Sequence, residues 1–459
     1  MARFIEETSL EAIPRQVSDK AKALILNILG SALAGSTEKT GRIGIDLAKE
    51  TGGFPHCTVI GGGFKVSPLL AALANGISAH ATDQDDTDSR TQAHPTAAVV
   101  PAVLAAGEYV HASGKKVLES YILGVEAECK VGWGISPMHL EMGFHATGTL
   151  GHVGATVGAC KVMGLSASEI ETALGIMGSL SSGIRHNVGS MTKPLHAGNA
   201  AHNGVLAAML AKKAFTSVEN VLENHQGFAD VFGGKNADPG RMVGDLGKPY
   251  MIESPGLIIK ANPCGTYASV IVQALQEMMK KFHFTPEAIQ KIKIVLNPTV
   301  HAIMHFVYPK DMLEAKYSIP FIAAVTLRDG EATLKQFTDE KTKDPIIRDL
   351  ISKIDIQHYP SPSKNEDLRN ISGADLSLTH LTIELRGGKR YSRTVDSAKG
   401  YADQPITGKE LRERFRTFAD LVLPKPSISK TIRMVESLEK LRDIGELMEE
   451  IGKAPAKGK

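Results

Sequence analysis

Two Ala-rich helical patterns with an acidic loop between them constrain the fold of this chain most strongly. The first pattern runs over residues 68–80, and the second begins at Pro95. Carboxylates join an apolar core only when they are paired or functional. The loop is therefore either a solvated surface turn or part of a site. Asp88 stands where a calcium loop needs glycine, which argues against such a loop. The loop carries Asp83, Asp85, Asp86 and Asp88.

A basic or histidine residue in front of a small-residue helix occurs three times. His94 precedes Pro95, Lys193 precedes Pro194, and His145 opens a helical pattern of small residues. Proline favours the first helical position, which predicts His94 and Lys193 at helix N-caps. A helix N-terminus carries free N–H groups and a partial positive charge. Three such termini predict a site for a small polycarboxylate.

Four motifs, in this order along the chain, resemble the MmgE/PrpD family. They are Asp83-x-Asp-Asp-Thr87 with His94-Pro95, Gly143-Phe-His145-x-Thr147-Gly148, Thr192-Lys193-Pro194-Leu-His196-x-Gly-Asn-Ala-Ala, and Lys260-x-x-Pro263-Cys264. Each motif alone is weak evidence, whereas the four together are specific. The flanking pattern extends the resemblance over nearly the whole chain.

The resemblance implies both a fold and a chemistry. Family members have a helical domain, completed by C-terminal helices, with an inserted α+β lid. They act on small polycarboxylates without a cofactor, by dehydrating 2-methylcitrate, decarboxylating cis-aconitate or epimerising iminodisuccinate. We therefore expect a cofactor-independent lyase, or an isomerase, that moves a proton next to a carboxylate and uses no metal.

The resemblance also assigns roles to single residues. His94 is the first choice for the proton carrier, because the pKa of histidine lies near neutrality, and His145 is the second. Asp83 is expected to orient His94 or a lysine. Lys193 and Lys260 would hold carboxylates as point charges. Thr87 would donate a hydrogen bond to substrate.

The sequence pattern itself points to further polar candidates. Arg185 lies in a Gly-rich loop just before Lys193, where a guanidinium can bind a carboxylate with two hydrogen bonds. Tyr317 is a candidate contact on the lid side. His196 and His202 are six residues apart on one helix, and we interpret both as structural. Cys264 is expected to pack rather than react.

Two other classes of function stay open at this point. A metal-dependent hydro-lyase or hydrolase would use the cluster from Asp83 to Asp86, and metal analysis would reveal it. A non-catalytic carboxylate-binding protein would bind tightly without turnover. Net charge is +2, which gives no argument for nucleic acid or membrane as a partner.

At 459 residues the chain predicts two domains. Residues 1–258 and 398–459 are expected to be all-helical and residues 259–397 to be α+β, so the fold class is mainly α. In the first part we expect helices over 15–35, 67–82, 95–112 and 115–134, and from residues 146 and 194. Gly148, Gly151, Gly154 and Gly158 predict close helix packing, because no strand precedes them as a dinucleotide site requires.

The second part alternates between helix and strand. We expect helices over 266–282 and 313–327, strands over 289–297 and 354–359, and a hairpin of 376–385 with 389–395 around Gly387-Gly388. Helices over 408–421 and 427–451 follow, and residues 454–459 should fray. Four cysteines without CxxC spacing and an N-terminus unlike a signal peptide favour the cytoplasm. A homodimer is expected, mainly from the resemblance.

Overall fold

The structure is a computed structural model that describes residues 1–360 and 373–454. The predicted fraying of the tail therefore falls almost wholly outside the described residues. The chain divides into two compact units. The helical unit comprises residues 1–186, 192–257 and 407–459, and the α+β unit comprises residues 187–191 and 258–406. The prediction of a mainly α fold with a smaller α+β part is confirmed.

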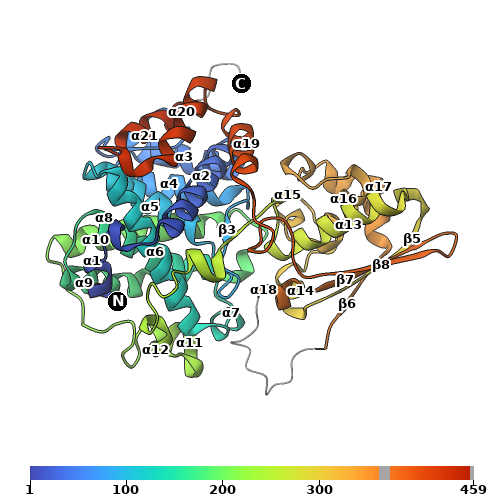
Figure 1. Cartoon of the computed structure of the whole chain (residues 1–459), viewed down its shortest axis with the longest axis horizontal. Coiled ribbons are helices and arrows are strands. Elements are labelled where there is room, and N and C mark those ends of the chain that lie inside the picture. The colour runs from blue at the N-terminus through green and yellow to red at the C-terminus, as the bar shows by residue number, and fades with distance from the viewer. Residues whose placement is uncertain (361–372, 455–459) are drawn as a thin grey trace. The chain divides into compact units, whose positions relative to one another are not determined.

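The first half of the helical unit is built mainly of helices (Figure 1). Ser67 and Pro68 show why α4 begins where it does: the Ser67 hydroxyl accepts a hydrogen bond from Leu70 N–H, and the proline occupies the first turn. The helices are α1 (Ala2–Glu7), α2 (Arg15–Thr37), α3 (Lys39–Thr51), α4 (Pro68–Ala81), α5 (Pro95–Tyr109) and α6 (Gly114–Ile135). Short strands β1 (Cys57–Thr58) and β2 (Lys65–Val66) pair antiparallel within this part.

The second half of the helical unit is less regular than its sequence pattern predicts. The α-helices described between residues 213 and 251 are short, because this stretch carries turn-forming Gly, Asn and Pro. The sequence therefore overstated an all-helical first 250 residues. The elements are α7 (Met138–Glu141), α8 (Ala146–Val162), α9 (Ala167–Leu180), α10 (Thr192–Lys212), α11 (Phe228–Gly233) and α12 (Pro239–Val243), with the short strand β3 (Asp86–Thr87) between α4 and α5.

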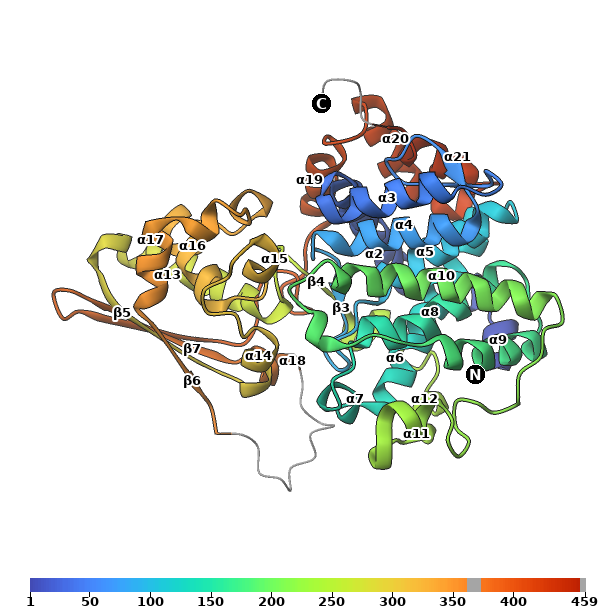
Figure 2. The same ribbon diagram turned by 180° about the vertical axis from the view of Figure 1, so that it is seen from behind.

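Glycines let the helices of this unit approach closely. A Cβ atom on Gly158 of α8 would lie 2.5 Å from Val103 of α5, and one on Gly76 of α4 would lie 2.6 Å from Gly198 Cα of α10. Contacts this short leave no room for a side chain. The predicted packing role of the α8 glycines is confirmed. Figure 2 shows α10 running beside α4 and α8, so these contacts fix the helices that carry the site.

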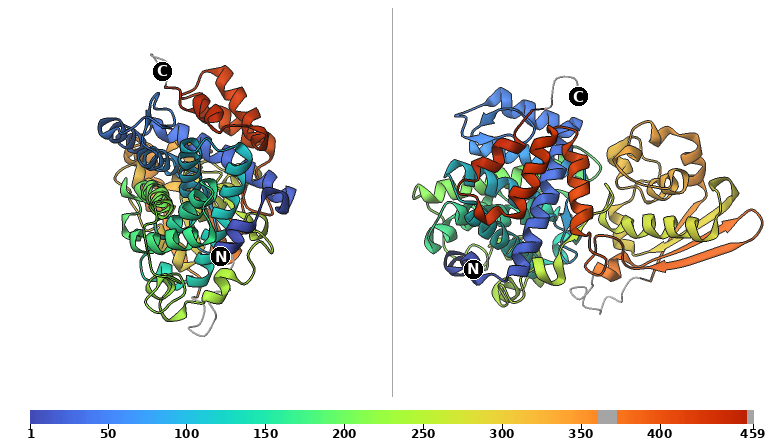
Figure 3. Two further views of the ribbon diagram at one scale, coloured as in Figure 1. Left: turned by 90° about the vertical axis from the view of Figure 1, so that its left-hand side faces the viewer. Right: turned by 45° about the horizontal axis from the view of Figure 1, so that its top comes forward.

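The last helices of the chain pack on its first long helix. Phe415 of α19 (Gly408–Ala419) lies 3.2 Å from a Cβ position on Gly30 of α2, and Figure 3 shows the C-terminal helices alongside α2. The prediction of one helix over 427–451 is wrong. The chain forms α20 (Lys425–Glu436) and α21 (Gly445–Ile451), because the segment from Ser437 leaves helical geometry.

The α+β unit is built on a four-stranded sheet with strand order β6-β5-β7-β8. Its central strand alternates as predicted, with Ile292, Ile294 and Leu296 buried. The strands are β5 (Ile289–Leu296), β6 (Ile354–His358), β7 (Thr379–Leu385) and β8 (Arg390–Val395). β6 runs parallel to β5, and β7 and β8 form the predicted hairpin. Gly388 turns it with a φ of 79°.

Helices pack around this sheet to form the core of the α+β unit. The predicted helix over 313–327 is broken at Lys316–Ser318, because the Ser318 hydroxyl caps a new helix at Phe321 N–H. The helices are α13 (Ser269–Phe282), α14 (Pro298–Ile303), α15 (Met312–Ala315), α16 (Ile319–Asp329), α17 (Pro345–Ser352) and α18 (Gly373–Ser377), and strand β4 is Ile258–Ile259. Across the described ranges, no helix is long and apolar enough to cross a membrane.

Candidate active site

The acidic loop after α4 is buried. The exposed fractions are 2% for Asp83, 0% for Asp85, 1% for Asp86 and 0% for Asp88. The alternative of a solvated surface loop is therefore wrong. Asp83 turns the chain with a positive φ of 57°, a conformation that aspartate tolerates better than most residues. Burial of four carboxyl groups in so short a segment requires partners for them.

Asp83 is paired with Lys193. The Nζ of Lys193 lies 2.7 Å from Asp83 Oδ1, and both side chains are nearly inaccessible. The expected contact between Asp83 and a lysine is therefore present. The predicted N-cap position of Lys193 is wrong, since α10 already begins at Thr192. Lys193 lies in the first turn, where its side chain can reach across to the loop.

His94 is held in one tautomer by the backbone. It is the N-cap residue of α5, as predicted, but its side chain does not cap the helix. Instead Nδ1 lies 2.7 Å from the Asp86 carbonyl oxygen. A carbonyl oxygen only accepts, so Nδ1 donates and Nε2 keeps a lone pair in the neutral ring. The Thr87 hydroxyl lies 3.2 Å from the same Nδ1.

His145 and His196 contact each other. His145 is the N-cap residue of α8, and its Nδ1 lies 2.9 Å from Nδ1 of His196 on α10. One nitrogen must donate to the other, so the two neutral rings hold opposite tautomers. Burial lowers the pKa of His145 well below its usual value and that of His196 to about 4. His196, interpreted as structural from the sequence, therefore lies against a residue of the candidate site.

His80 is a residue that the sequence reasoning missed. It stands in the last turn of α4, and its Nδ1 lies 2.7 Å from Asp85 Oδ2. Both side chains are 0% exposed. Burial lowers the pKa of His80, Asp85 opposes this, and Lys193 adds to it. The available signal was a histidine in an Ala-rich helix, five residues before an aspartate.

Three imidazoles thus meet at one place in the helical unit. The ring centroids of His80 and His94 are 4.9 Å apart, and His145 lies 6.1 Å from His80 and 6.5 Å from His94. The residues come from α4, α5 and α8, and Lys193 comes from α10. The site combines the Lys193 ammonium group, its partner Asp83 and three imidazoles, which suits binding of an anion and proton transfer.

Comparison with known proteins decides the family. Residues 1–239 match the MmgE/PrpD N-terminal domain, and residues 263–440 match the MmgE/PrpD C-terminal domain. The chain belongs to the MmgE/PrpD family. The resemblance seen in the four motifs is confirmed.

Several cis-aconitate decarboxylases align with most of this MmgE/PrpD chain. Cis-aconitate decarboxylase of Homo sapiens is 25% identical over 438 residues, covering 93% of this chain and 89% of the relative. The Mus musculus cis-aconitate decarboxylase is 26% identical, with 92% and 87% covered. The cis-aconitate decarboxylase of Aspergillus terreus is 27% identical over 475 residues, with 98% and 94% covered.

One cation of this MmgE/PrpD site comes from far along the sequence. Arg414 of α19 donates from a terminal nitrogen to the Gln84 carbonyl oxygen at 2.9 Å. Burial lowers the pKa of its guanidinium to about 10, while Asp85 opposes this. Sequence reasoning missed Arg414, because no motif marks it.

The other predicted residues divide between the two units. Arg185 lies next to the His145 segment, since its N–H donates to the Gly143 carbonyl oxygen at 2.9 Å. Burial lowers the pKa of its guanidinium. Lys260 directly follows β4, and Tyr317 lies between α15 and α16, both in the α+β unit. Their part in the site of this MmgE/PrpD protein stays a prediction.

Ligand atoms suited to a metal ion also occur in the cluster. One atom from each of His80, His94 and His145 lies within 4.8 Å of the others, and the same holds for His80, Asp83 and Asp85. However, Asp83 is already bound to Lys193, whose positive charge competes with a divalent ion. A divalent ion bound by His80, Asp83 and Asp85 would therefore lie next to the Lys193 ammonium group.

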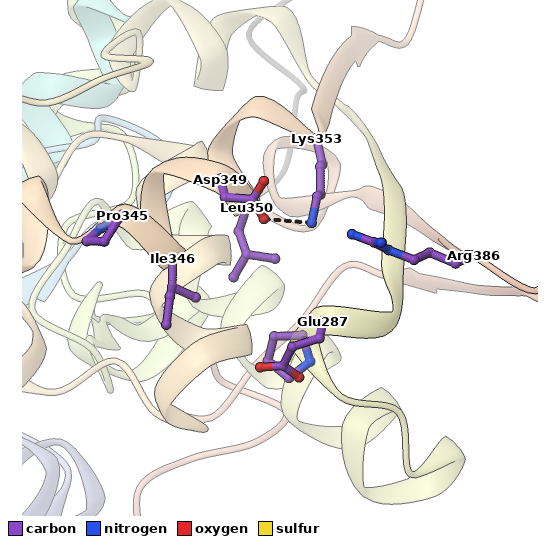
Figure 4. Close-up of a pocket in the computed structure, with 8 residues that line it drawn as sticks. Glu287, Pro345, Ile346, Asp349, Leu350, Lys353 and Arg386 are labelled. Atoms are coloured by element: carbon purple, nitrogen blue, oxygen red, sulfur yellow. Dashed lines mark hydrogen bonds and ion pairs between the residues drawn. The ribbon is translucent and has the colours of Figure 1, made fainter.

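A surface pocket in the α+β unit has a different character. It has a volume of about 410 Å³ and lies between α17 and the β7–β8 hairpin (Figure 4). Lys353 is paired there with Asp349 at 2.7 Å. Its lining holds no histidine, and we do not assign the family's chemistry to it. The lining residues are Pro286, Glu287, Pro345, Ile346, Asp349, Leu350, Lys353 and Arg386.

Proposed function

We propose that this protein is a cofactor-independent carboxy-lyase that decarboxylates cis-aconitate. The observation that carries the proposal is a buried cluster of His80, His94 and His145 beside the Lys193–Asp83 pair, in a chain that aligns almost end to end with cis-aconitate decarboxylases. A tricarboxylate needs cationic and N–H partners to leave water. Decarboxylation also needs a proton donor at the carbon.

The reaction can be written with these groups. The bond between a CH₂ carbon and its carboxylate breaks, CO₂ leaves, and the electron pair spreads over an allylic system into a neighbouring carboxylate. A proton from an imidazolium then forms the new C–H bond at the other end of the allylic system. The imidazole becomes neutral and regains its proton from solvent. The product is itaconate.

Each predicted residue has a role in this proposal. Lys193 holds a substrate carboxylate, and Asp83 positions Lys193. His94 is the first candidate for the proton donor and His145 the second. Thr87, Arg185, Lys260 and Tyr317 remain proposed substrate-binding residues. Lys260 and Tyr317 rest on the family resemblance and the sequence pattern alone.

The test is product analysis in deuterated water. The protein is incubated with cis-aconitate, 2-methylcitrate, citrate or iminodisuccinate, and the products are followed by NMR. We expect CO₂ release from cis-aconitate alone and itaconate carrying one deuterium, because the donor imidazole exchanges its proton with solvent. Dehydration of 2-methylcitrate or epimerisation of iminodisuccinate, without CO₂ release, would assign the protein to another branch of the family.

Chelation separates this proposal from a metal-dependent lyase. Exhaustive treatment with EDTA should leave turnover unchanged, because the Lys193 ammonium group, positioned by Asp83, holds the substrate carboxylate that a metal would otherwise bind. Loss of activity that a divalent ion restores would instead favour a metal-dependent hydro-lyase at the same aspartates. Metal analysis of the untreated protein is the control.

We also propose a cytoplasmic homodimer with the α+β unit as a lid domain. All four cysteines are buried, and no disulfide joins them within residues 1–360 and 373–454, which agrees with a reducing compartment. Closed symmetric assemblies predominate among soluble oligomers. Sedimentation at micromolar concentration tests the dimer, and a monomer there would contradict it.

A further inference from the structure

His80 has two ring nitrogens in contrasting surroundings. Nδ1 is held by the Asp85 carboxylate at 2.7 Å. Nε2 is buried, and none of the residues described by the structure forms a hydrogen bond with it. A buried polar atom without a partner requires an explanation. A ring nitrogen of each of His80, His94 and His145 lies within 4.8 Å of the others, so the explanation belongs to the same site.

We propose that His80 and Asp85 form a catalytic dyad in which His80 Nε2 donates a hydrogen bond to the substrate carboxylate that takes up negative charge. The inference rests on the proposed function and adds a catalytic residue to it. Asp85 acts through His80 and is a positioning residue. Preorganised donors aimed at developing charge supply a large part of catalysis in many enzymes.

The dyad adds a second role without changing the balance of the reaction. When CO₂ leaves, the electron pair reaches the oxygen atoms of a neighbouring carboxylate. His80 Nε2–H donates to such an oxygen and keeps its proton. His94 supplies the proton for the new C–H bond. One imidazole therefore stabilises charge while another transfers the proton, and each turnover consumes one solvent proton.

The surroundings of His80 explain when Nε2 carries a proton. Without substrate, burial and Lys193 favour the neutral ring, although Asp85 opposes them. A bound tricarboxylate adds negative charge and favours the imidazolium, which Asp85 then compensates. Binding should therefore be coupled to proton uptake. The charged and titratable groups around the dyad are Asp83, Asp86, His94, His145, Lys193 and His196, together with Arg414 near Asp85.

Kinetics of matched variants test the role of each atom. His80→Leu removes the donor, and we expect kcat to fall about 10²- to 10³-fold with a smaller change in KM. His80→Gln keeps an amide donor and should lose less. Asp85→Asn removes the compensating charge, which makes the imidazolium less stable. The alkaline limb of the kcat profile should then move to lower pH, a result that a structural role would not produce.

His139→Gln is the control for loss of a buried imidazole. His139 is fully hydrogen-bonded, through Nδ1 to the Phe232 carbonyl oxygen and through Nε2 to the Thr149 hydroxyl. It is outside the proposed machinery, so its kcat should stay within about twofold of the wild type. Circular dichroism checks the fold of each variant. If His80→Leu does not fold, the pH profile of kcat for Asp85→Asn and the NMR measurement below test the dyad instead.

NMR of the protein with ¹⁵N-labelled histidine measures the protonation state of the His80 ring directly. The unreactive propane-1,2,3-tricarboxylate is added, and the signal missing from His80→Gln identifies His80. We expect a change from the neutral Nδ1–H tautomer to the doubly protonated ring. A ring that stays neutral, or His80→Leu with kcat and pH profile like the wild type, would overturn the dyad. Absence of CO₂ release by the wild type would instead overturn the proposed function, and the NMR result would still be readable.

Discussion

Lys193 and Asp83 show at the scale of single residues how a buried charge depends on its partner. Lys193→Met removes the ammonium partner of the Asp83 carboxylate, which is only 2% exposed. We expect a loss of about 3 kcal/mol in the free energy of unfolding. The double variant Asp83→Asn with Lys193→Met should recover most of that stability, because the buried carboxylate that lost its ammonium partner is removed as well.

Enzyme kinetics on the same variants separate stability from binding. Both variants lack the ammonium group, so both should keep a raised KM for cis-aconitate. Urea unfolding and initial rates measure the two effects. A double variant with a normal KM would show that Lys193 serves only to neutralise Asp83.

Residues of the site were predictable from the sequence where a motif marked them. Asp83, His94, His145 and Lys193 stand in motifs, and the structure gathers them around one cluster. His80, His196 and Arg414 were missed or read as structural. Their contacts depend on the way α4, α10 and α19 pack, and spacing along one helix does not reveal a partner on another.

At the scale of elements, the close contact between α4 and α10 constrains the site. A Cβ atom on Gly198 would lie 2.5 Å from the Leu73 carbonyl oxygen, which is backbone and cannot swing away. Gly198→Ala should therefore push the helices apart and cost roughly 1–3 kcal/mol of stability. Because α4 carries His80 and α10 carries Lys193, kcat/KM should fall as well.

Gly408→Ala is the matched control for this prediction. A Cβ there meets only the Arg412 guanidinium at 3.7 Å, an ordinary contact, and alanine favours helix. Thermal unfolding and kcat/KM of the two variants give the comparison. Equal behaviour of the two variants would contradict the role assigned to the α4–α10 contact.

Helices and strands were predicted well where the hydrophobic periodicity ended at the same position as a turn-forming residue. Strand β5 and the β7–β8 hairpin follow their alternation and the Gly387-Gly388 turn. The predictions of single helices over 313–327 and 427–451 were wrong. Local features such as the Ser318 cap interrupt the helix, although the hydrophobic pattern of the sequence continues across the break. Helix α3 was missed because Gly41 and Gly44 weaken its helical pattern.

At the scale of the whole molecule, buried neutral histidines make stability depend on pH. Burial lowers the pKa of His139 and of His152 to about 4 from 6.5. The unfolded chain then binds more protons than the folded one between these values. Stability is present above pH 6.5 and is lost as the pH falls through 4, by up to about 3 kcal/mol per histidine.

Replacement of one histidine tests whether buried histidines make the protein less stable as the pH falls. His152→Gln should lose less stability than the wild type between pH 7 and pH 4, as measured by urea unfolding at each pH. Asp86 works in the opposite direction, because burial raises the pKa of its carboxyl to about 7. A variant with an unchanged slope would show that His152 does not contribute to acid unfolding.

The contact of α19 with the acidic loop has a consequence for synthesis of the chain. Arg414 reaches the Gln84 carbonyl oxygen, and α19 covers Gly30 of α2, yet a ribosome completes residues 258–406 before it makes α19. A nascent chain that ends before residue 407 has its α+β sequence in full but leaves the face of α2 around Gly30 open to water. Such a chain should bind chaperones at α2 and gain activity only after α19 has emerged.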